Sequence, residues 1–450
     1  MDGRPWLAAG RRTSPAGPRT RPGAGHARVR GARRGRPFSE LHPDLRPVLA
    51  ADRSDGAPLR AGGNGVTATL VGFDVTPLEE REPTGVGRYV ERLLAALVAR
   101  GDTHRYHLLA SRPLHGALPT GVVGPVGRRF PTRWLWMQTM LPVILHRLRP
   151  HVCHFTNGMA PLGCPYPYVL TLYDMSLFLH ARTQPLKSRL LIRSLVPRVA
   201  RRAAAVITPT QSARADIIRV LGLPAGRVHV VSGGVDPAFR PLDSPDALDP
   251  VRRRYGLDRP FILSVGTLEP RKNLGRLTRA LGQLRAQGRQ EELVLVGRHG
   301  WGRDEARRVA EELGIAATVR ILGYVPQSDL PALYALARVV AFPSLYEGFG
   351  FPIVEAMACG TPVLTSNRSA MAEVGHDAAL LIDPTAVGSI ADGLAALLDD
   401  EPLRERLRGA GLHRAASLRW PTVAERTVAV YDRVVAAAGA ARTRLEERPA

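Results

Sequence analysis

The chain has little cysteine and contains no long apolar run. Its three cysteines, Cys153, Cys164 and Cys359, show no paired metal-ligand spacing, so the sequence indicates neither a disulfide framework nor a zinc site. No apolar stretch approaches the roughly 20 residues that a membrane-spanning helix needs, and no apolar segment follows the twin arginines near the N-terminus. We therefore expect a cytoplasmic protein without a spanning segment or an export signal.

Lysine is nearly absent, although the chain is strongly basic. The formal net charge is +22, and the only lysines are Lys187 and Lys272, while arginine is spread along the whole chain. That even spread indicates a coding bias rather than a designed patch, so we do not expect a nucleic-acid partner. A basic surface would still favour an anionic membrane or anionic substrates.

Residues 1–65 also lack a periodic apolar pattern, and this Arg-, Gly- and Pro-rich extension is predicted to be disordered. Short β-rich runs then alternate with helical patterns over 66–240 and again over 260–420, while 241–259 is dense in Pro and Asp and predicts a linker. The alternation predicts an α/β fold with two doubly wound parallel sheets facing a cleft, in which ligands bind at the carboxyl ends of the strands. The expected strands cover 66–75, 106–110, 152–155, 168–173, 205–208 and 228–231 in the first half, and 261–265, 292–296, 318–322, 339–342, 362–365 and 379–382 in the second.

The sharpest motif is P-S-L-Y-E-G-F-G-F-P-I-V-E-A-M-A-C-G-T-P-V-L-T-S, from Pro343 to Ser366. A predicted strand ends just before it, Gly348 and Gly350 permit a tight loop, and Pro352 suits a first helical turn. Such a loop aims free backbone N–H groups and the positive end of a helix at an anion, as a diphosphate requires.

Glu347 and Glu355 bracket this loop. If Glu347 lies in the loop and Glu355 in the first helical turn, both carboxylates can face the cleft and accept hydrogen bonds from sugar hydroxyls. A carboxylate in a first turn also favours the helix dipole without any ligand. The pair together with the Gly-rich loop favours the functional interpretation.

A second motif, S-V-G-T-L-E-P-R-K-N-L, follows the first strand of the second half. It contains Gly266, and its Arg271 and Lys272 can lie beside a pyrophosphate, the arginine as a fork and the lysine as a point charge. A solvated basic turn is the alternative. A rare lysine at a strand-to-helix turn favours function, whereas Lys187 has no such context.

A weaker motif is T-G-V-G, which contains Gly85 and Gly87 and follows the first strand. Short glycine pairs after strands often only turn the chain. Because this turn is expected to face the second half, Gly85 can let the backbone approach a phosphate or the transferred sugar.

These motifs occur together with V-G-R-H-G-W-G at 296–302, G-Y-V-P-Q-S-D-L-P-A-L-Y at 323–334 and T-S-N-R-S-A-M-A-E-V at 365–374. In combination they resemble the retaining glycosyltransferases of family 4, which have the GT-B fold, over residues 66–438. The resemblance implies an acceptor domain at 66–240, a nucleotide-sugar donor domain at 260–420, and a C-terminal helix at 421–438 that returns to the first domain.

The resemblance also implies a reaction. A mannose-like hexose would pass from a GDP- or UDP-linked donor to a glycan or lipid-linked acceptor of the cell envelope, with retention at the anomeric carbon and without a metal or another cofactor. Arg271 and Lys272 would stabilise the leaving diphosphate, Glu347 would contact the donor sugar, and Glu355 would bind the ribose. The departing phosphate would itself deprotonate the attacking hydroxyl. The other substrate-binding positions would be Gly85, Gly87, Tyr173, Asp174, Gly266, Gly348, Phe349 and Gly350.

One position departs from the family's pattern. Many relatives carry His-Asp where this chain has Tyr173 and Asp174, and that His is thought to touch the transferred sugar. Tyr173 can still donate a hydrogen bond, and Asp174 remains a site candidate at a strand end. At another strand end, His154 and Asn157 either line the acceptor pocket or structure a loop.

Three alternatives stay open. Residues 133–149, R-W-L-W-M-Q-T-M-L-P-V-I-L-H-R-L-R, are typical either of peripheral association with the inner face of a membrane or of a core-packing helix. A nucleotide-sugar epimerase or a sugar phosphorylase would use a similar scaffold, although the paired glutamates argue against both. A nucleotide-sugar-binding protein without catalysis is compatible with the altered position of Tyr173.

Overall fold

The protein is described by a computed structural model that covers residues 68–80, 85–112, 114, 123–126, 132–180, 186–300 and 304–446. The disorder predicted for 1–65 lies outside the described residues, as does Thr84 of the T-G-V-G motif.

The first domain is built on a seven-stranded parallel sheet in the order β3-β2-β1-β4-β5-β6-β7. Its inner strands β4, β5 and β6 are completely buried, which explains why they are short apolar runs rather than alternating ones. The strands are β1 (Thr69–Asp74), β2 (His104–Leu109), β3 (Val123–Val126), β4 (Val152–Phe155), β5 (Tyr168–Thr171), β6 (Ala205–Thr208) and β7 (Val228–Val230).

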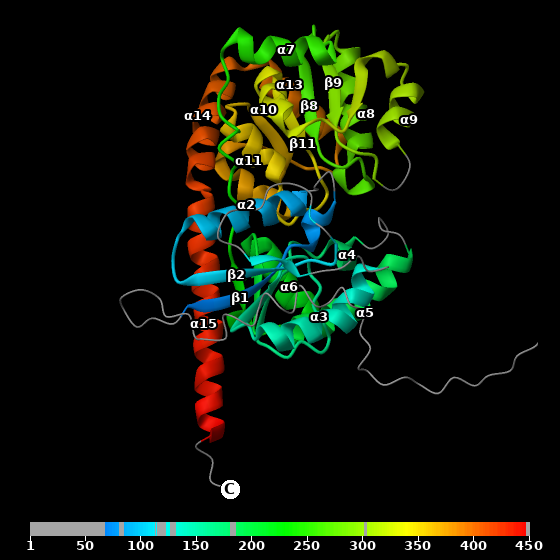
Figure 1. The fold of residues 1–450 in the computed structure, drawn as a ribbon. Helices are drawn as coiled ribbons and strands as arrows, with labels where there is room; N and C mark the ends of the chain where they lie inside the picture. Colours follow the sequence, from blue (N-terminus) through cyan, green and yellow to red (C-terminus); the bar gives the residue numbers. More distant parts are fainter. Residues whose placement is uncertain are drawn as a thin grey trace, which may run out of the picture. The chain divides into compact units, whose positions relative to one another are not determined.

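Helices cover both faces of this sheet (Figure 1). Helix α2 (Gly85–Ala99) packs on one face together with the C-terminal helix α15 (Trp420–Glu446). Three helices pack on the other face: α3 (Arg133–Leu148), α5 (Leu186–Arg202) and α6 (Gln211–Leu221). The short helix α4 (Ser176–Leu179) follows β5.

The second domain has a six-stranded parallel sheet in the order β10-β9-β8-β11-β12-β13, with a buried apolar cluster on each face. Its strands are β8 (Phe261–Val265), β9 (Glu292–Val296), β10 (Val319–Gly323), β11 (Val339–Phe342), β12 (Val363–Ser366) and β13 (Leu380–Ile382). Its helices are α7 (Pro245–Tyr255), α8 (Leu274–Ala286), α9 (Glu305–Glu312), α10 (Leu330–Leu336), α11 (Phe351–Ala358), α12 (Ser369–Gly375), α13 (Val387–Asp399) and α14 (Glu401–Ser417).

The α/β fold with two doubly wound parallel sheets is confirmed, with two local differences. The edge strand β3 was not predicted, because its sequence V-G-P-V holds a glycine and a proline, which only an edge strand tolerates. The linker predicted at 241–259 contains helix α7. Its Pro245 occupies the start of the helix, where a proline loses no hydrogen bond, and its Val251 is buried in the second domain's core.

The chain passes between the domains twice, once after β7 and once before α15, and the two connecting segments lie side by side. The backbone N–H of Val235 donates to the carbonyl oxygen of Leu418 at 2.8 Å, so the outgoing and returning segments are hydrogen-bonded. Helix α15 then buries Trp420, Val423 and Tyr431 against the first sheet, and it extends beyond the predicted 421–438. No helix among the described residues is both long enough and apolar enough to span a membrane.

Candidate active site

A cleft of about 620 Å³ lies between the carboxyl ends of the two sheets. It is lined by every residue predicted for the site except Gly87: by Gly85, Tyr173 and Asp174 of the first domain, and by Gly266, Arg271, Lys272, Glu347, Gly348, Phe349, Gly350 and Glu355 of the second. Among the described residues, no group of His, Cys, Asp or Glu side chains could hold a metal ion. The roles of the lining residues stay predictions.

The turn after β8 carries the two cations. Arg271 and Lys272 lie in a single 3-10 turn that ends at Asn273, whose φ of 62° is left-handed. The side-chain amide of Asn273 donates to the carbonyl oxygens of Pro343, at 3.1 Å, and Pro384, at 2.6 Å. This buried asparagine therefore ties the turn to the ends of two other strands, β11 and β13, and fixes the direction of both cations.

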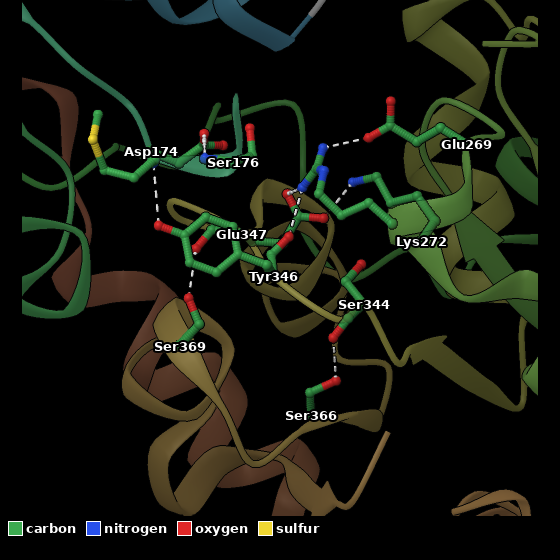
Figure 2. A network of polar contacts seen from close by, with 11 residues as sticks. Asp174, Ser176, Glu269, Lys272, Ser344, Tyr346, Glu347, Ser366 and Ser369 are labelled. Carbon is green, nitrogen blue, oxygen red and sulfur yellow. Dashed lines mark hydrogen bonds and ion pairs between the residues drawn. The ribbon is translucent and has the colours of Figure 1, made fainter. Parts of the chain in front are cut away.

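Glu347 lies between these cations, and Figure 2 shows it beside Lys272. Its Oε1 accepts from Lys272 Nζ at 2.7 Å, and its Oε2 lies 2.6 Å from Arg271 Nη1. Arg271 Nη2 also donates to Glu269 Oε1 at 2.5 Å. The four side chains form a row, Glu269, Arg271, Glu347 and Lys272, whose formal charges sum to zero.

The charges in the row set the ionisation states of Glu347 and Arg271. Burial alone would raise the pKa of Glu347, but Lys272 and Arg271 outweigh burial and hold that pKa at about 2. Burial would lower the pKa of Arg271, yet the carboxylates of Glu347, Asp174 and Glu269 raise it above its ordinary value. Glu347 is therefore a carboxylate at neutral pH and a weak base.

Serine hydroxyls hold the backbone of the Gly-rich loop. Ser369 Oγ donates to the carbonyl oxygen of Glu347 at 2.9 Å, and Ser366 Oγ donates to that of Ser344 at 2.6 Å (Figure 2). Both donors come from the end of β12 and the start of α12, so the neighbouring strand positions the loop that presents Glu347.

Glu355 lies in the second turn of α11, because the helix begins at Phe351; its expected place in the first turn is wrong. The hydroxyl of Tyr334 donates to Glu355 Oε2 at 2.7 Å. Burial raises the pKa of Glu355, while Tyr334 and Arg88 oppose this rise. The two paired glutamates thus occupy contrasting surroundings, one next to two cations and one largely desolvated.

At Gly348 the two domains approach each other closely. A Cβ at this position would lie 2.0 Å from the carbonyl oxygen of Tyr173, so only glycine fits. Thr210 Oγ1 donates to the carbonyl oxygen of Gly348 at 2.9 Å. Gly350, with φ of 96°, then starts α11. The first glycine allows contact between the domains, and the second turns the chain into the helix.

Two more contacts join the domains, and neither was predicted. The hydroxyl of Tyr346 donates to Asp216 Oδ2 at 2.9 Å and accepts from the backbone N–H of Met175 at 3.1 Å. The carboxylate of Glu373 accepts from two backbone N–H groups at the start of α6, each at 2.9 Å. A helix N-terminus of the first domain is thus capped by a carboxylate of the second.

Helix α2 brings further side chains to the cleft. It begins at Gly85, and Arg88 and Arg92 follow along the cleft side at helical spacing. Arg92 also forms an ion pair with Asp236. Gly87 is buried within the helix and does not line the cleft, so its predicted contact with substrate has no geometric support. The i, i+3, i+7 spacing from Gly85 is the sequence signal that could have identified both arginines.

Tyr173 presents an unusual hydroxyl. Its ring packs edge-on against Tyr89, with centroids 5.3 Å apart, and within the described residues its buried hydroxyl oxygen has no hydrogen-bond partner. Burial raises the pKa of Tyr173, so the group stays a neutral donor. Asp174 Oδ1 accepts from the backbone N–H of Ser176 at 2.8 Å (Figure 2).

The strand end at His154 has a structural role. His154 is fully buried, and its ring nitrogens lie 2.6 Å from the hydroxyl of Tyr431 and 2.7 Å from Oγ1 of Thr171. Burial lowers its pKa to about 3. Neither His154 nor Asn157 lines the cleft. His154 instead anchors α15 to the first sheet.

Comparisons with known proteins identify the family of both domains. Residues 250–414 match the family model described as "Glycosyl transferases group 1", and residues 83–239 match "Glycosyltransferase Family 4". The "O-antigen chain mannosyltransferase B" of Escherichia coli is 34% identical over 265 residues, which cover 58% of this chain and 69% of that protein. The "MMP alpha-(1->4)-mannosyltransferase" of Mycolicibacterium hassiacum is 35% identical over 245 residues, or 53% of this chain, and the chain spans only 56% of its length.

Among solved structures, Anabaena Alr3699/HepE in complex with UDP and glucose has a TM-score of 0.65 to this chain. The match covers 81% of this chain and 99% of that one, at 20% sequence identity. A likeness at this identity shows that the fold is shared.

Proposed function

The chain belongs to the family 4 glycosyltransferases and has their GT-B fold, and on that premise we propose the transfer that it performs. A mannose-like hexose passes from a GDP- or UDP-linked donor to a glycan or lipid-linked glycan acceptor of the cell envelope, with retention and without a metal. The names of the Escherichia coli and Mycolicibacterium relatives support mannose. One observation carries the proposal: Arg271 and Lys272 lie beside Glu347 in the cleft, next to the Gly-rich loop that starts α11.

The diphosphate fits the unused hydrogen-bond donors of this row. Lys272 Nζ has three N–H groups, and its hydrogen bond to Glu347 uses one. Arg271 Nε is buried and has no hydrogen-bond partner among the described residues. A phosphate oxygen satisfies such a donor, and the backbone N–H groups of Gly350 and Phe351, at the start of α11, supply more.

The two glutamates then bind the two sugar rings of the nucleotide sugar. Glu347 accepts hydrogen bonds from hydroxyls of the hexose, and Glu355, on the second turn of α11, accepts from the ribose hydroxyls. The raised pKa of Glu355 favours this assignment to a neutral hydroxyl over contact with a cation.

In the reaction, the bond between the anomeric carbon and the phosphate oxygen breaks, and a bond from the acceptor oxygen forms on the same face. The acceptor proton passes to the departing phosphate oxygen. A pKa of about 2 makes Glu347 too weak a base for this proton, which supports the phosphate as its acceptor. Arg271 and Lys272 stabilise the charge that develops on the leaving diphosphate.

Thermal shift of the full chain with GDP, UDP and ADP tests the donor site, since a ligand that binds only the folded state raises the melting temperature. We expect one nucleotide to raise it, and Lys272→Ala and Glu355→Ala to lose this shift while their unliganded circular dichroism is unchanged. Lys187→Ala is the matched control, because Lys187 is the second lysine of the chain and lies on α5, outside the cleft. Unchanged nucleotide affinity in both site variants would refute the assignment.

Product analysis tests the stereochemistry. With mannose-type donors that carry the base identified by the thermal shift, NMR of the glycoside product should show, at the new linkage, the anomeric configuration of the donor. An inverted product would exclude the proposed course of the reaction while leaving the donor site in place.

A further inference from the structure

Helix α3 exposes several large apolar side chains. Trp134, Leu135, Met140 and Val143 are each 40–46% exposed, and we call these four residues the α3 strip. Other side chains of the helix, Met137, Leu141 and Leu145 among them, are buried in the first domain's core. Both interpretations of 133–149 therefore describe one helix, which packs on the core and also exposes large apolar side chains to water.

Cations are numerous in this part of the sequence, and carboxylates are nearly absent. Between residues 103 and 215 the sequence has fifteen Arg or Lys residues and one acidic residue, Asp174. Helix α5 exposes four arginines near its end, at 193, 198, 201 and 202. Arg198 and Arg202 donate to backbone carbonyls, and Arg193 lies over the ring of Phe178. Among the described residues none of these four arginines forms an ion pair with a carboxylate.

The strip and the arginines belong to one face of the first domain. Both helices pack on the same core under the sheet (Figure 1). Gln138 of α3 accepts from the backbone N–H of Leu162 at 2.9 Å, and Arg202 of α5 donates to the carbonyl oxygen of the same residue. One residue thus bridges the two helices, so the apolar strip and the cations border each other.

We infer that the α3 strip and the α5 arginines form a docking surface for an anionic lipid bilayer. Aromatic and aliphatic side chains enter the boundary between headgroups and acyl chains, while arginines next to them pair with lipid phosphates. A nucleic acid offers no apolar surface for the strip. A second copy of the same strongly basic face would be repelled, which argues against self-association.

The surface also borders the catalytic edge of the sheet. The guanidinium of Arg133, at the start of α3, lies 3.7 Å from Oδ2 of Asp74, which is the last residue of β1. Helix α3 therefore begins at the strand ends that face the cleft. If the proposed function holds, a lipid-linked acceptor reaches the cleft from this side.

Vesicle flotation of the full chain tests the inference. The vesicles contain phosphatidylcholine alone, or phosphatidylcholine with about one third phosphatidylglycerol, at low and at high salt. The Leu135→Ser/Val143→Ser variant removes half of the strip. The matched control is Leu313→Ser/Leu381→Ser, which replaces two apolar residues of the second domain that are 43% and 37% exposed. The basic extension 1–65 is present in all three proteins, so its contribution cancels.

We expect the wild type and the control to float with anionic vesicles at low salt, and the strip variant to bind roughly tenfold less. Equal binding by the strip variant, or equal binding of the wild type to neutral vesicles, would overturn the inference. So would a dimer, seen by light scattering, that the strip variant loses. The nucleotide-induced thermal shift should be unchanged in the strip variant, which separates a failure of this surface from a failure of the donor site.

Discussion

Replacing Glu347 with Gln removes one negative charge from the row in the cleft and changes the size of the side chain little. Arg271 and Lys272 are then each only 13% exposed, and within the row Glu269 remains as a close partner of Arg271 alone. Leaving a buried charge without its partner typically destabilises a protein by about 3–5 kcal/mol. We therefore expect a large loss of stability from a nearly isosteric change.

The pKa of Glu347 gives an independent magnitude. It falls from an ordinary 4.5 to about 2 on folding, which corresponds to about 3 kcal/mol of stabilisation of the folded state. Because the folded pKa lies below the unfolded one, this contribution is complete above pH 4.5 and is lost as the pH falls toward 2. At pH 4 the wild type should already have lost roughly 1 kcal/mol of it.

Urea unfolding followed by circular dichroism at pH 7 and pH 4 measures the difference. Glu347→Gln should be about 3 kcal/mol less stable than the wild type at pH 7 and about 2 kcal/mol less stable at pH 4. Glu405→Gln, at an exposed glutamate of α14, is the control and should match the wild type at both values. Glu347 is not coupled to the two cations if the variant is as stable as the wild type at pH 7. The same conclusion follows if the difference in stability between the two proteins is not smaller at pH 4 than at pH 7.

Three other substitutions test separate parts of the cleft. Gly348→Ala places a methyl group 2.0 Å from the carbonyl oxygen of Tyr173, so the domains must separate; kcat/KM should fall roughly 100-fold and the radius of gyration from X-ray scattering should rise, and an unchanged rate would contradict this. Tyr173→Phe should raise the donor KM about fivefold without lowering stability, because it removes only an unpaired hydroxyl; an unchanged KM would mean that this hydroxyl does not touch the donor. For Glu355→Gln, the stability of the wild type relative to the variant should fall as the pH rises from 4.5 through the raised pKa of Glu355. This trend is opposite to that for Glu347. Melting curves from pH 4 to 7 measure its direction.

Much of the fold could be predicted because parallel strands are buried on both faces. Strands such as Val152–Phe155 and Val339–Phe342 are apolar runs bounded by polar or turn residues, and the structure has them where the pattern placed them. The pattern fails where local signals conflict with packing. Helix α7 starts on Pro245 in a stretch that composition alone marks as a linker, and Val251 makes it a helix by packing in the core.

The site could be predicted only in part, for a similar reason. Arg271, Lys272 and Glu347 follow strand ends, and the carboxyl ends of parallel strands meet at one edge, so their proximity follows from topology. The bond from Tyr334 to Glu355 depends on how α10 packs against α11, which no local pattern reveals. The bond from Tyr346 to Asp216 depends on how the two domains meet.

Glu347 both stabilises and orients the two cations of the cleft. A preformed site for a diphosphate needs cations in fixed positions, yet two uncompensated buried cations would cost several kcal/mol of stability. Glu269 and Glu347 offset that cost and orient Arg271 and Lys272 at the same time. Because the row is then neutral, its attraction for a diphosphate depends on the N–H groups that the carboxylates leave unused, above all the Nε of Arg271, rather than on net positive charge. In the proposed transfer, the same carboxylate that stabilises the cations would also face the hexose once a diphosphate takes the remaining hydrogen-bond donors, so one glutamate would serve both the fold and the reaction.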